Sequence, residues 1–231
     1  LSLAPDLVVG SAASGPPQVI RQIRGAGVRV ELIPDAKRPE DAAAYVRAVA
    51  AALGAVDAGE RLAAEVEREI AEARRLVADA GALPSAVFVW GRGNGVLSIA
   101  GTGTGANVMF AEAGVANAAG ALDGYQPMNP EALIVSDPEV IVVPEHTAEE
   151  LGGIDALLRQ PGIGATRAGR ARRVVTVDLL AFVGFGPRTG ESLRAFVTDL
   201  TAGTSPAGAR APGSSPPPSP ARVPDRAPRL R

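Results

Sequence analysis

The residues best suited to binding chemistry are few, and they follow the ends of apolar segments. The stretch Trp90-Gly-Arg92-Gly-Asn-Gly95 comes directly after an apolar run. Its glycines let the backbone approach a bulky planar group closely, and the Arg92 guanidinium can pair with a carboxylate through two hydrogen bonds. An exposed hairpin turn that carries a solvated arginine explains the same stretch equally well.

Three more side chains are candidates for the same kind of site. His146 is the single histidine and follows an apolar segment, so it is a metal-ligand candidate as well as an ordinary surface histidine. Tyr125 can ligate a metal as phenolate or simply cap its part of the fold. Arg188, in Phe185-Gly-Pro-Arg188, either faces a crevice and binds an anion or belongs to a helix-start turn.

One motif suggests an enzyme instead. Gly101-Thr-Gly-Thr-Gly-Ala106 satisfies the loose form of a dinucleotide fingerprint, and Asp123 follows at a suggestive distance. The apolar run before it is short, and turn glycines ahead of a helix that starts at Thr104 explain the motif as well. A nucleotide-binding α/β enzyme therefore stays as the weaker alternative to a binding protein.

The sequence lacks the residues that several other kinds of catalytic or metal site require. The chain has no cysteine, which excludes disulfides, thiolate metal sites and cysteine nucleophiles. It has no Gly-x-Ser-x-Gly elbow and no His-Glu-x-x-His pair, and no serine and aspartate are evident partners for His146. We expect a protein that is not an enzyme and has no catalytic cofactor.

The first part of the chain alternates between strand and helix patterns. Leu1–Gly10 ends in a short apolar strand, Gln18–Gly25 is helical, Val28–Ile33 is a second strand, and Pro39–Leu53 is an amphipathic helix between Pro39 and Gly54. This alternation predicts parallel strands with helices on their faces.

The longest helical pattern covers Asp57–Ala80, with apolar residues at helical spacing and Glu–Arg pairs between them. A helix of this length spans about 36 Å, enough to run the length of a small lobe. Strand and helix patterns then resume, and a turn of proline and an acidic residue feeds a buried strand in each half. The expected elements are 86–90, 96–100, 105–113, 131–135, 139–143, 154–158, 174–177 and 190–200.

These patterns predict an α/β fold in which two lobes with mainly parallel sheets are joined by one long α-helix. The predicted parts are an N-terminal lobe over 1–56, a connecting helix over 57–82 and a C-terminal lobe over 83–202. Residues 203–231 are rich in proline and poor in apolar side chains, which predicts a disordered tail.

Composition narrows the choice of partners. The chain has 231 residues, 46% of them hydrophobic, enough for one large domain or two lobes. The tail carries five Arg and one Asp, a net of +4, so residues 1–202 account for −6 of the total of −2. An acidic body argues against nucleic acid as a partner, and no apolar run reaches the length that a bilayer requires.

Over residues 1–202 the sequence resembles the haemin-binding periplasmic proteins of ABC transporters, within a group that also binds siderophores and cobalamin. The stretches that carry the resemblance are LSLAPDLVVGSAASGPPQVI, AGTGTGANVMFAEAGVANAAGALDGYQPMNPEALIVSDPEVIVV, GGIDALLRQPGIGATRAGRARRVVTVD and FGPR. The resemblance implies haem as transported ligand, with a ferric siderophore or cobalamin as the alternative cargo.

The resemblance also implies roles for the candidates. Trp90, Arg92, Tyr125 and Arg188 would contact the ligand, the arginines through haem propionates, and His146 would ligate the haem iron. Glu131, at the start of a helix, would meet an arginine of the ABC permease; a carboxylate that interacts favourably with the helix dipole is the plainer explanation. A monomer in the periplasm, or otherwise outside the cytoplasmic membrane with or without an anchor, is expected.

The start of the chain adds one further expectation. It opens without Met inside an apolar run, and the family carries an iron ligand and a permease-docking Glu just ahead of the position that matches Leu1. We therefore expect an incomplete N-terminal lobe with part of the signal, anchor and ligand set upstream. A degenerate copy that binds nothing is the remaining alternative.

Overall fold

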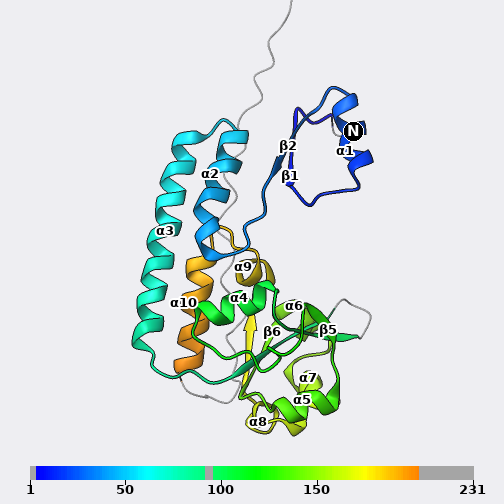
Figure 1. Cartoon of the computed structure of the whole chain (residues 1–231), viewed down its shortest axis with the longest axis vertical. Coiled ribbons are helices and arrows are strands. Elements are labelled where there is room, and N and C mark those ends of the chain that lie inside the picture. The colour runs from blue at the N-terminus through cyan, green and yellow to red at the C-terminus, as the bar shows by residue number, and fades with distance from the viewer. Residues whose placement is uncertain (1–3, 92–95, 203–231) are drawn as a thin grey trace, which may run out of the picture.

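The computed structural model describes residues 4–91 and 96–202 (Figure 1). The predicted tail from residue 203 and the candidate Arg92 lie outside the described residues, so both remain predictions. None of the helices in the described ranges is long and apolar enough to cross a membrane.

A small βαβ unit begins the described chain. β1 (Leu7–Ser11) and β2 (Arg29–Ile33) pair in parallel along all of their length, and α1 (Pro17–Gly25) connects them. Pro17 occupies the first turn of α1, where its missing N–H costs nothing. Parallel pairing across a helical connection is what the alternating pattern predicts.

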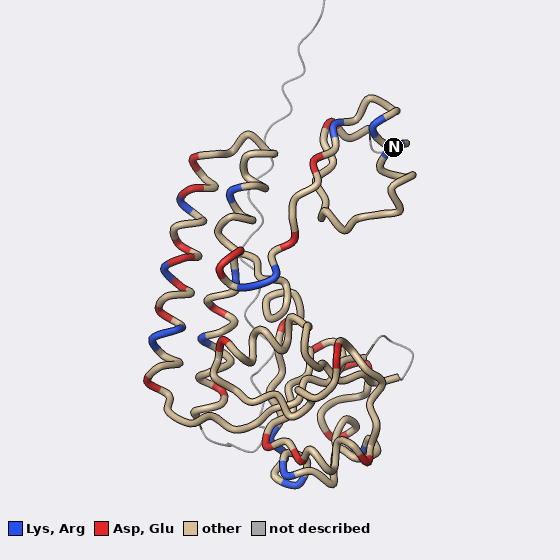
Figure 2. Tube along the Cα trace, in the orientation of Figure 1, with Lys and Arg blue, Asp and Glu red and all other residues tan. Residues whose placement is uncertain are grey.

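Two helices follow this unit in the chain and precede the larger sheet. A 3-10 turn, η1 (Pro39–Asp41), leads into α2 (Ala42–Ala52), and α3 (Val56–Asp79) begins after a short turn. The long helix predicted over 57–80 is confirmed within one residue at each end. Acidic and basic residues follow one another along the trace of α3 (Figure 2). Arg47 of α2 reaches Glu60 and Glu67 of α3 at 2.9 Å each.

α3 packs along both α2 and α10 (Thr189–Thr201) through small residues. A Cβ atom built on Gly59 would lie 2.2 Å from the Ala50 Cβ, and one built on Gly190 would lie 2.6 Å from the backbone carbon of Glu69. Such separations require glycine at both crossings. The buried stripe of α3 is Gly59, Ala63, Val66, Ile70 and Ala73.

The larger sheet has five strands in the order β5-β4-β3-β6-β7. Its parallel part is β3 (Ala86–Gly91), β6 (Val140–Pro144) and β7 (Val174–Val177), each apolar along most of its length because helices cover both faces. β4 (Leu97–Ala100) and β5 (Tyr125–Pro127) complete the sheet as antiparallel strands.

The direction of β4 corrects one detail of the sequence prediction, which placed residues 96–100 in a continuing βα alternation. Only residues 92–96 separate β3 from β4, too few for the crossover that a parallel neighbour needs. The connection is a hairpin, which is the alternative reading of the glycine-rich stretch after Trp90.

Two apolar clusters cover the two faces of the larger sheet. On one face α4 (Gly105–Glu112), α9 (Leu179–Val183) and α10 pack on Phe88 and Val142. On the other face Val87 and Ile141 meet the helices that lie between β5 and β7 in the chain. These are α5 (Pro130–Ser136), α6 (Glu145–Glu150), α7 (Ile154–Leu158), η2 (Ile163–Ala165) and α8 (Arg167–Arg170).

Gly190→Ala tests the close crossing of α3 and α10. The added methyl group meets the backbone of Glu69 and Ile70, so the free energy of unfolding should fall by about 1–3 kcal/mol in urea denaturation. Gly25→Ala is the matched control, because this helical glycine has nothing within 4 Å of an added Cβ; its stability should stay equal or rise slightly. Equal stability of Gly190→Ala and the unmodified chain would contradict the packing described.

Candidate functional site

The carboxyl ends of strands mark the place to look, since ligands of open parallel sheets bind beyond those ends. In Figure 1 β6 and β7 point toward the small unit, and the loop that follows β1 lies on the side of that unit nearer the larger sheet. In this view the carboxyl ends of β1 and β7 lie toward each other (Figure 1). Three of the six predicted site residues, Trp90, His146 and Arg188, lie close to the carboxyl ends of β3, β6 and β7 in the chain. Tyr125 begins β5 and reaches this edge through its ring contact with Trp90.

Trp90 and Tyr125 form an aromatic pair at this edge. Trp90 is half-buried near the end of β3, Tyr125 is 38% exposed at the start of β5, and their ring centroids lie 5.3 Å apart at 60°. β4 separates the two strands, so the pair spans two strand spacings. The sheet thus brings together two candidates that stand 35 positions apart in the sequence.

Burial affects the chemistry of Tyr125. Desolvation raises the pKa of its phenol above the ordinary value of 10.0. Burial therefore makes the charged phenolate form of the free side chain less favourable, whereas ring stacking and hydrogen bonding do not require it. Trp90 offers an N–H donor and a π face, and no lone pair for iron.

His146 follows the buried strand β6, as the sequence indicates, and lies in α6. It is exposed at the second position of α6, and its Nε2 lies 3.4 Å from Thr147 Oγ1. The buried Thr147 hydroxyl accepts a hydrogen bond from the backbone N–H of Gly91, at 3.3 Å. This link ties the start of α6 to the residue that follows Trp90, so His146 and the aromatic pair belong to one edge.

Arg188 has a partner within the protein. Its Nη1 donates to Asp178 Oδ2 at 2.8 Å, and Asp178 Oδ1 accepts from the backbone N–H of Ala181 as the N-cap of α9. Burial by itself would raise the pKa of Asp178, but the Ala181 N–H and the Arg188 guanidinium outweigh it, and the pKa is lowered. A ligand carboxylate at Arg188 would share the guanidinium with Asp178, a residue that sequence reasoning did not identify.

The dinucleotide motif has a structural explanation. A Cβ on Gly101 would lie 2.2 Å from the Leu122 carbonyl oxygen, and one on Gly105 would lie 2.9 Å from that of Val183. Thr104 caps α4 by accepting the Asn107 N–H at 3.1 Å. The strand before the motif, β4, is antiparallel to both of its neighbours, whereas the fingerprint belongs to a parallel βαβ unit.

Glu131 lies away from this edge, in the first turn of α5, where Asn129 caps the helix by accepting the Ala132 N–H at 2.9 Å. Its side chain is exposed and, within the part of the chain that the structure describes, makes no ion pair. A negative charge at this position interacts favourably with the helix dipole. It is also available to a cation on another protein.

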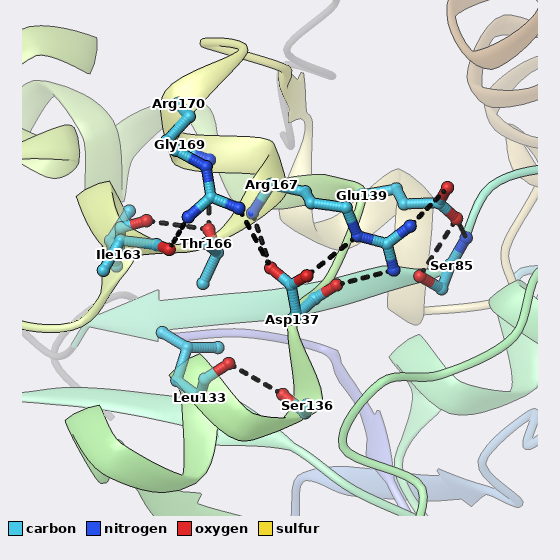
Figure 3. Close-up of polar contacts among 11 residues, drawn as sticks. Ser85, Leu133, Ser136, Asp137, Glu139, Ile163, Thr166, Arg167, Gly169 and Arg170 are labelled. Carbon is cyan, nitrogen blue, oxygen red and sulfur yellow. Dashed lines mark hydrogen bonds and ion pairs between the residues drawn. The ribbon is translucent and has the colours of Figure 1, made fainter.

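A polar network holds the far end of α5 (Figure 3). Arg167 donates to Asp137 through its backbone N–H at 2.7 Å and Nε at 2.9 Å, and to Glu139 through Nη1 at 3.0 Å. Glu139 also accepts the backbone N–H of Ser85 at 2.8 Å. At the other end of α5, a Cβ on Gly162 would lie 2.7 Å from the Pro130 Cα. Both ends of the helix that carries Glu131 are thus fixed.

The network makes a pH-dependent contribution to stability. The backbone N–H of Arg167 and its guanidinium lower the pKa of Asp137, and the Ser85 N–H and Arg167 lower that of Glu139. Because the folded pKa lies below the unfolded value of about 4, the unfolded state takes up protons first as the pH falls. The contribution is complete above the unfolded pKa and is lost as pH falls through the folded pKa.

Arg167→Gln should therefore flatten the acid side of the stability profile. Urea midpoints between pH 6 and pH 3 are expected to fall less steeply than for the unmodified chain, because the cation that favours both carboxylates is gone. Arg68→Gln removes a comparable exposed arginine from Glu65 and Glu72 on α3 and should keep the original slope. An unchanged slope in Arg167→Gln would show that its charge does not set these pKa values.

Comparison with known proteins decides the family. The family model described as periplasmic binding protein matches residues 1–179. The chain belongs to the periplasmic binding protein family. Among curated protein sequences none matches, whereas many solved structures do.

Three solved structures show how far the likeness of this periplasmic binding protein extends. The periplasmic heme-binding protein RhuT from Roseiflexus sp. RS-1 is 41% identical, with a TM-score of 0.83 over 87% of this chain and 78% of that one. BhuT in complex with two hemes is 40% identical, with a TM-score of 0.80 over 87% and 76%. A periplasmic heme-binding protein from Pseudomonas aeruginosa is 29% identical, with a TM-score of 0.76 over 90% and 76%. The predicted fold class is confirmed.

Proposed function

We propose that this periplasmic binding protein binds haem outside the cytoplasm and delivers it to the permease of an ABC importer. The observation that carries the proposal is the 40–41% identity to two proteins named for heme binding, across 87% of the chain. The relatives are binding proteins, so the function proposed is capture and release without catalysis, and haem is cargo and not a cofactor.

The residues at the carboxyl edge suit a flat, largely apolar molecule with an anionic rim. The ring pair of Trp90 and Tyr125 offers aromatic surface for the macrocycle. Arg92, next to that pair in the sequence, and Arg188 are the proposed partners of the propionates. His146 is the proposed iron ligand from this edge, because a neutral imidazole is a common haem ligand.

Release of haem would require the two proposed lobes to move relative to each other. The proposed division is a lobe over 1–56, the connecting helix over 57–82 and a lobe over 83–202. Small hinge motions about the connecting helix would signal occupancy to the permease. The proposed protein acts as a monomer, since one copy presents both edges.

A ferric siderophore or cobalamin is the alternative cargo, because the wider group of binding proteins takes all three classes. Siderophores lack a rigid porphyrin plane, so they gain little from the Trp90–Tyr125 pair. A nucleotide-binding enzyme is a poorer alternative, since packing explains Gly101 and Gly105. Cobalamin, a ferric siderophore and NAD(H) are therefore the competing ligands in a binding test.

Haemin titration followed by Soret absorbance tests the proposal. The unmodified chain should give a band that shifts and saturates, while NAD(H) should leave the thermal midpoint unchanged. Trp90→Ala and Arg92→Ala should each weaken binding by roughly tenfold, the scale of one lost aromatic or charge-assisted contact. Arg61→Ala, an exposed arginine of α3, is the control. If cobalamin or a siderophore bound saturably and haemin did not bind, the proposed ligand would be wrong, while membership of the family would stand.

Glu131 is proposed to dock on a basic residue of the permease. Glu131→Gln should leave haemin affinity unchanged and reduce stimulation of the importer's ATPase in proteoliposomes by several-fold, because only the charge at α5 is lost. Glu191→Gln, a change to an exposed carboxylate in the first turn of α10, should stimulate normally. If Glu131→Gln stimulated the ATPase as strongly as the unmodified chain, Glu131 would have no role in docking on the permease.

A further inference from the structure

α9 is a short helix that the core holds firmly from one side. Phe182 is fully buried, and its ring centroid lies 5.9 Å from that of Phe88, 6.3 Å from Phe110 and 5.1 Å from Phe196. The start of the helix is capped by Asp178. The orientation of α9 on the sheet is therefore determined by packing, and so is the direction of its outward face.

Leu180 occupies that outward face. It precedes Phe182 by two residues, about 200° around a helix, so it projects away from the aromatic cluster. Its exposed fraction is 74%, while Ala181 and Phe182 beside it are buried. A large aliphatic side chain is thus presented to solvent on a rigid turn directly after β7, at the carboxyl edge.

Trp90 and α9 lie on the same face of the sheet. Residues 88 and 90 alternate with 89 along β3 and so share a face, and Phe88 on that face stacks on Phe182 of α9. Trp90, one pleat nearer the carboxyl end, packs against the same apolar cluster as Leu179 and Val183. Leu180 therefore extends from a helix that shares this face of the sheet and this apolar cluster with Trp90.

We propose that Leu180 is a ligand contact, packing on a flat face of the bound macrocycle and contributing affinity without touching the iron. The inference rests on the proposed function and deepens it. This part of the larger unit then combines the rings of Trp90 and Tyr125, the aliphatic side chain of Leu180 and the ion pair between Arg188 and Asp178. Apolar faces and anionic carboxylates of a porphyrin match this combination.

The test compares Leu180→Asn with Leu180→Met and Val135→Asn in the full chain. Val135 is 85% exposed on α5, a helix on the other face of the sheet, so it controls for haemin adhering to any exposed apolar side chain. Each variant is titrated with haemin and with iron-free protoporphyrin. Thermal unfolding followed by circular dichroism checks that each is folded.

Leu180→Asn should bind both porphyrins roughly tenfold more weakly, the scale of one apolar contact replaced by an amide. The Soret maximum of its saturated haemin complex should match that of the unmodified chain, because leucine supplies no iron ligand. Leu180→Met should retain affinity, since its volume and polarity are similar, and Val135→Asn should be unaffected.

Unchanged affinity of Leu180→Asn for both porphyrins would overturn the inference and leave the proposed function standing. An equal loss in Val135→Asn, or a shifted Soret maximum in Leu180→Asn, would also overturn it. Failure of the unmodified chain to bind haemin at all would overturn the proposed function itself, and the role of Leu180 with it.

Discussion

The close approach of α3 to α2 and α10 is the constraint on which the rest of the structure depends. Gly59 and Gly190 bring the helices together so closely that a single methyl group at either position would strike the neighbouring helix. α2 follows the small βαβ unit, and α10 covers one face of the larger sheet. Through these contacts α3 joins the helix that follows the small unit to a helix that covers the larger sheet.

The larger sheet then determines which side chains can act together. Because β3, β6 and β7 are parallel, the residues that follow them emerge at one edge. The antiparallel strands β4 and β5 bring Tyr125 to the face of the sheet that carries Trp90, and the two rings meet there. The buried hydroxyl of Thr147 links the end of β3 to the helix that carries His146. The binding proposed for this edge relies on apolar contact and on charge.

The long helices and the buried strands were predicted from the sequence, whereas some of the short elements were not. The helices at 42–52, 56–79 and 189–201 and the buried strands carry enough periodic residues to predict their type. α6, α9 and β5, each of six residues or fewer, were missed, although α7 and β7 are as short and were predicted with the bounds that the structure shows. These short elements place His146, Leu180 and Tyr125. Asp178 was overlooked because an isolated aspartate before a helix looks like an ordinary cap.

The sequence by itself determined the class of fold, the long helix and the family, since these depend on patterns that repeat along the chain. The pairing of Trp90 with Tyr125, the engagement of Arg188 by Asp178 and the outward position of Leu180 were decided by the tertiary structure. Each depends on which strand lies beside which and on which helix face the core buries. Strand order and helix orientation depend on packing between segments that are distant in the chain, so a local sequence pattern does not predict them.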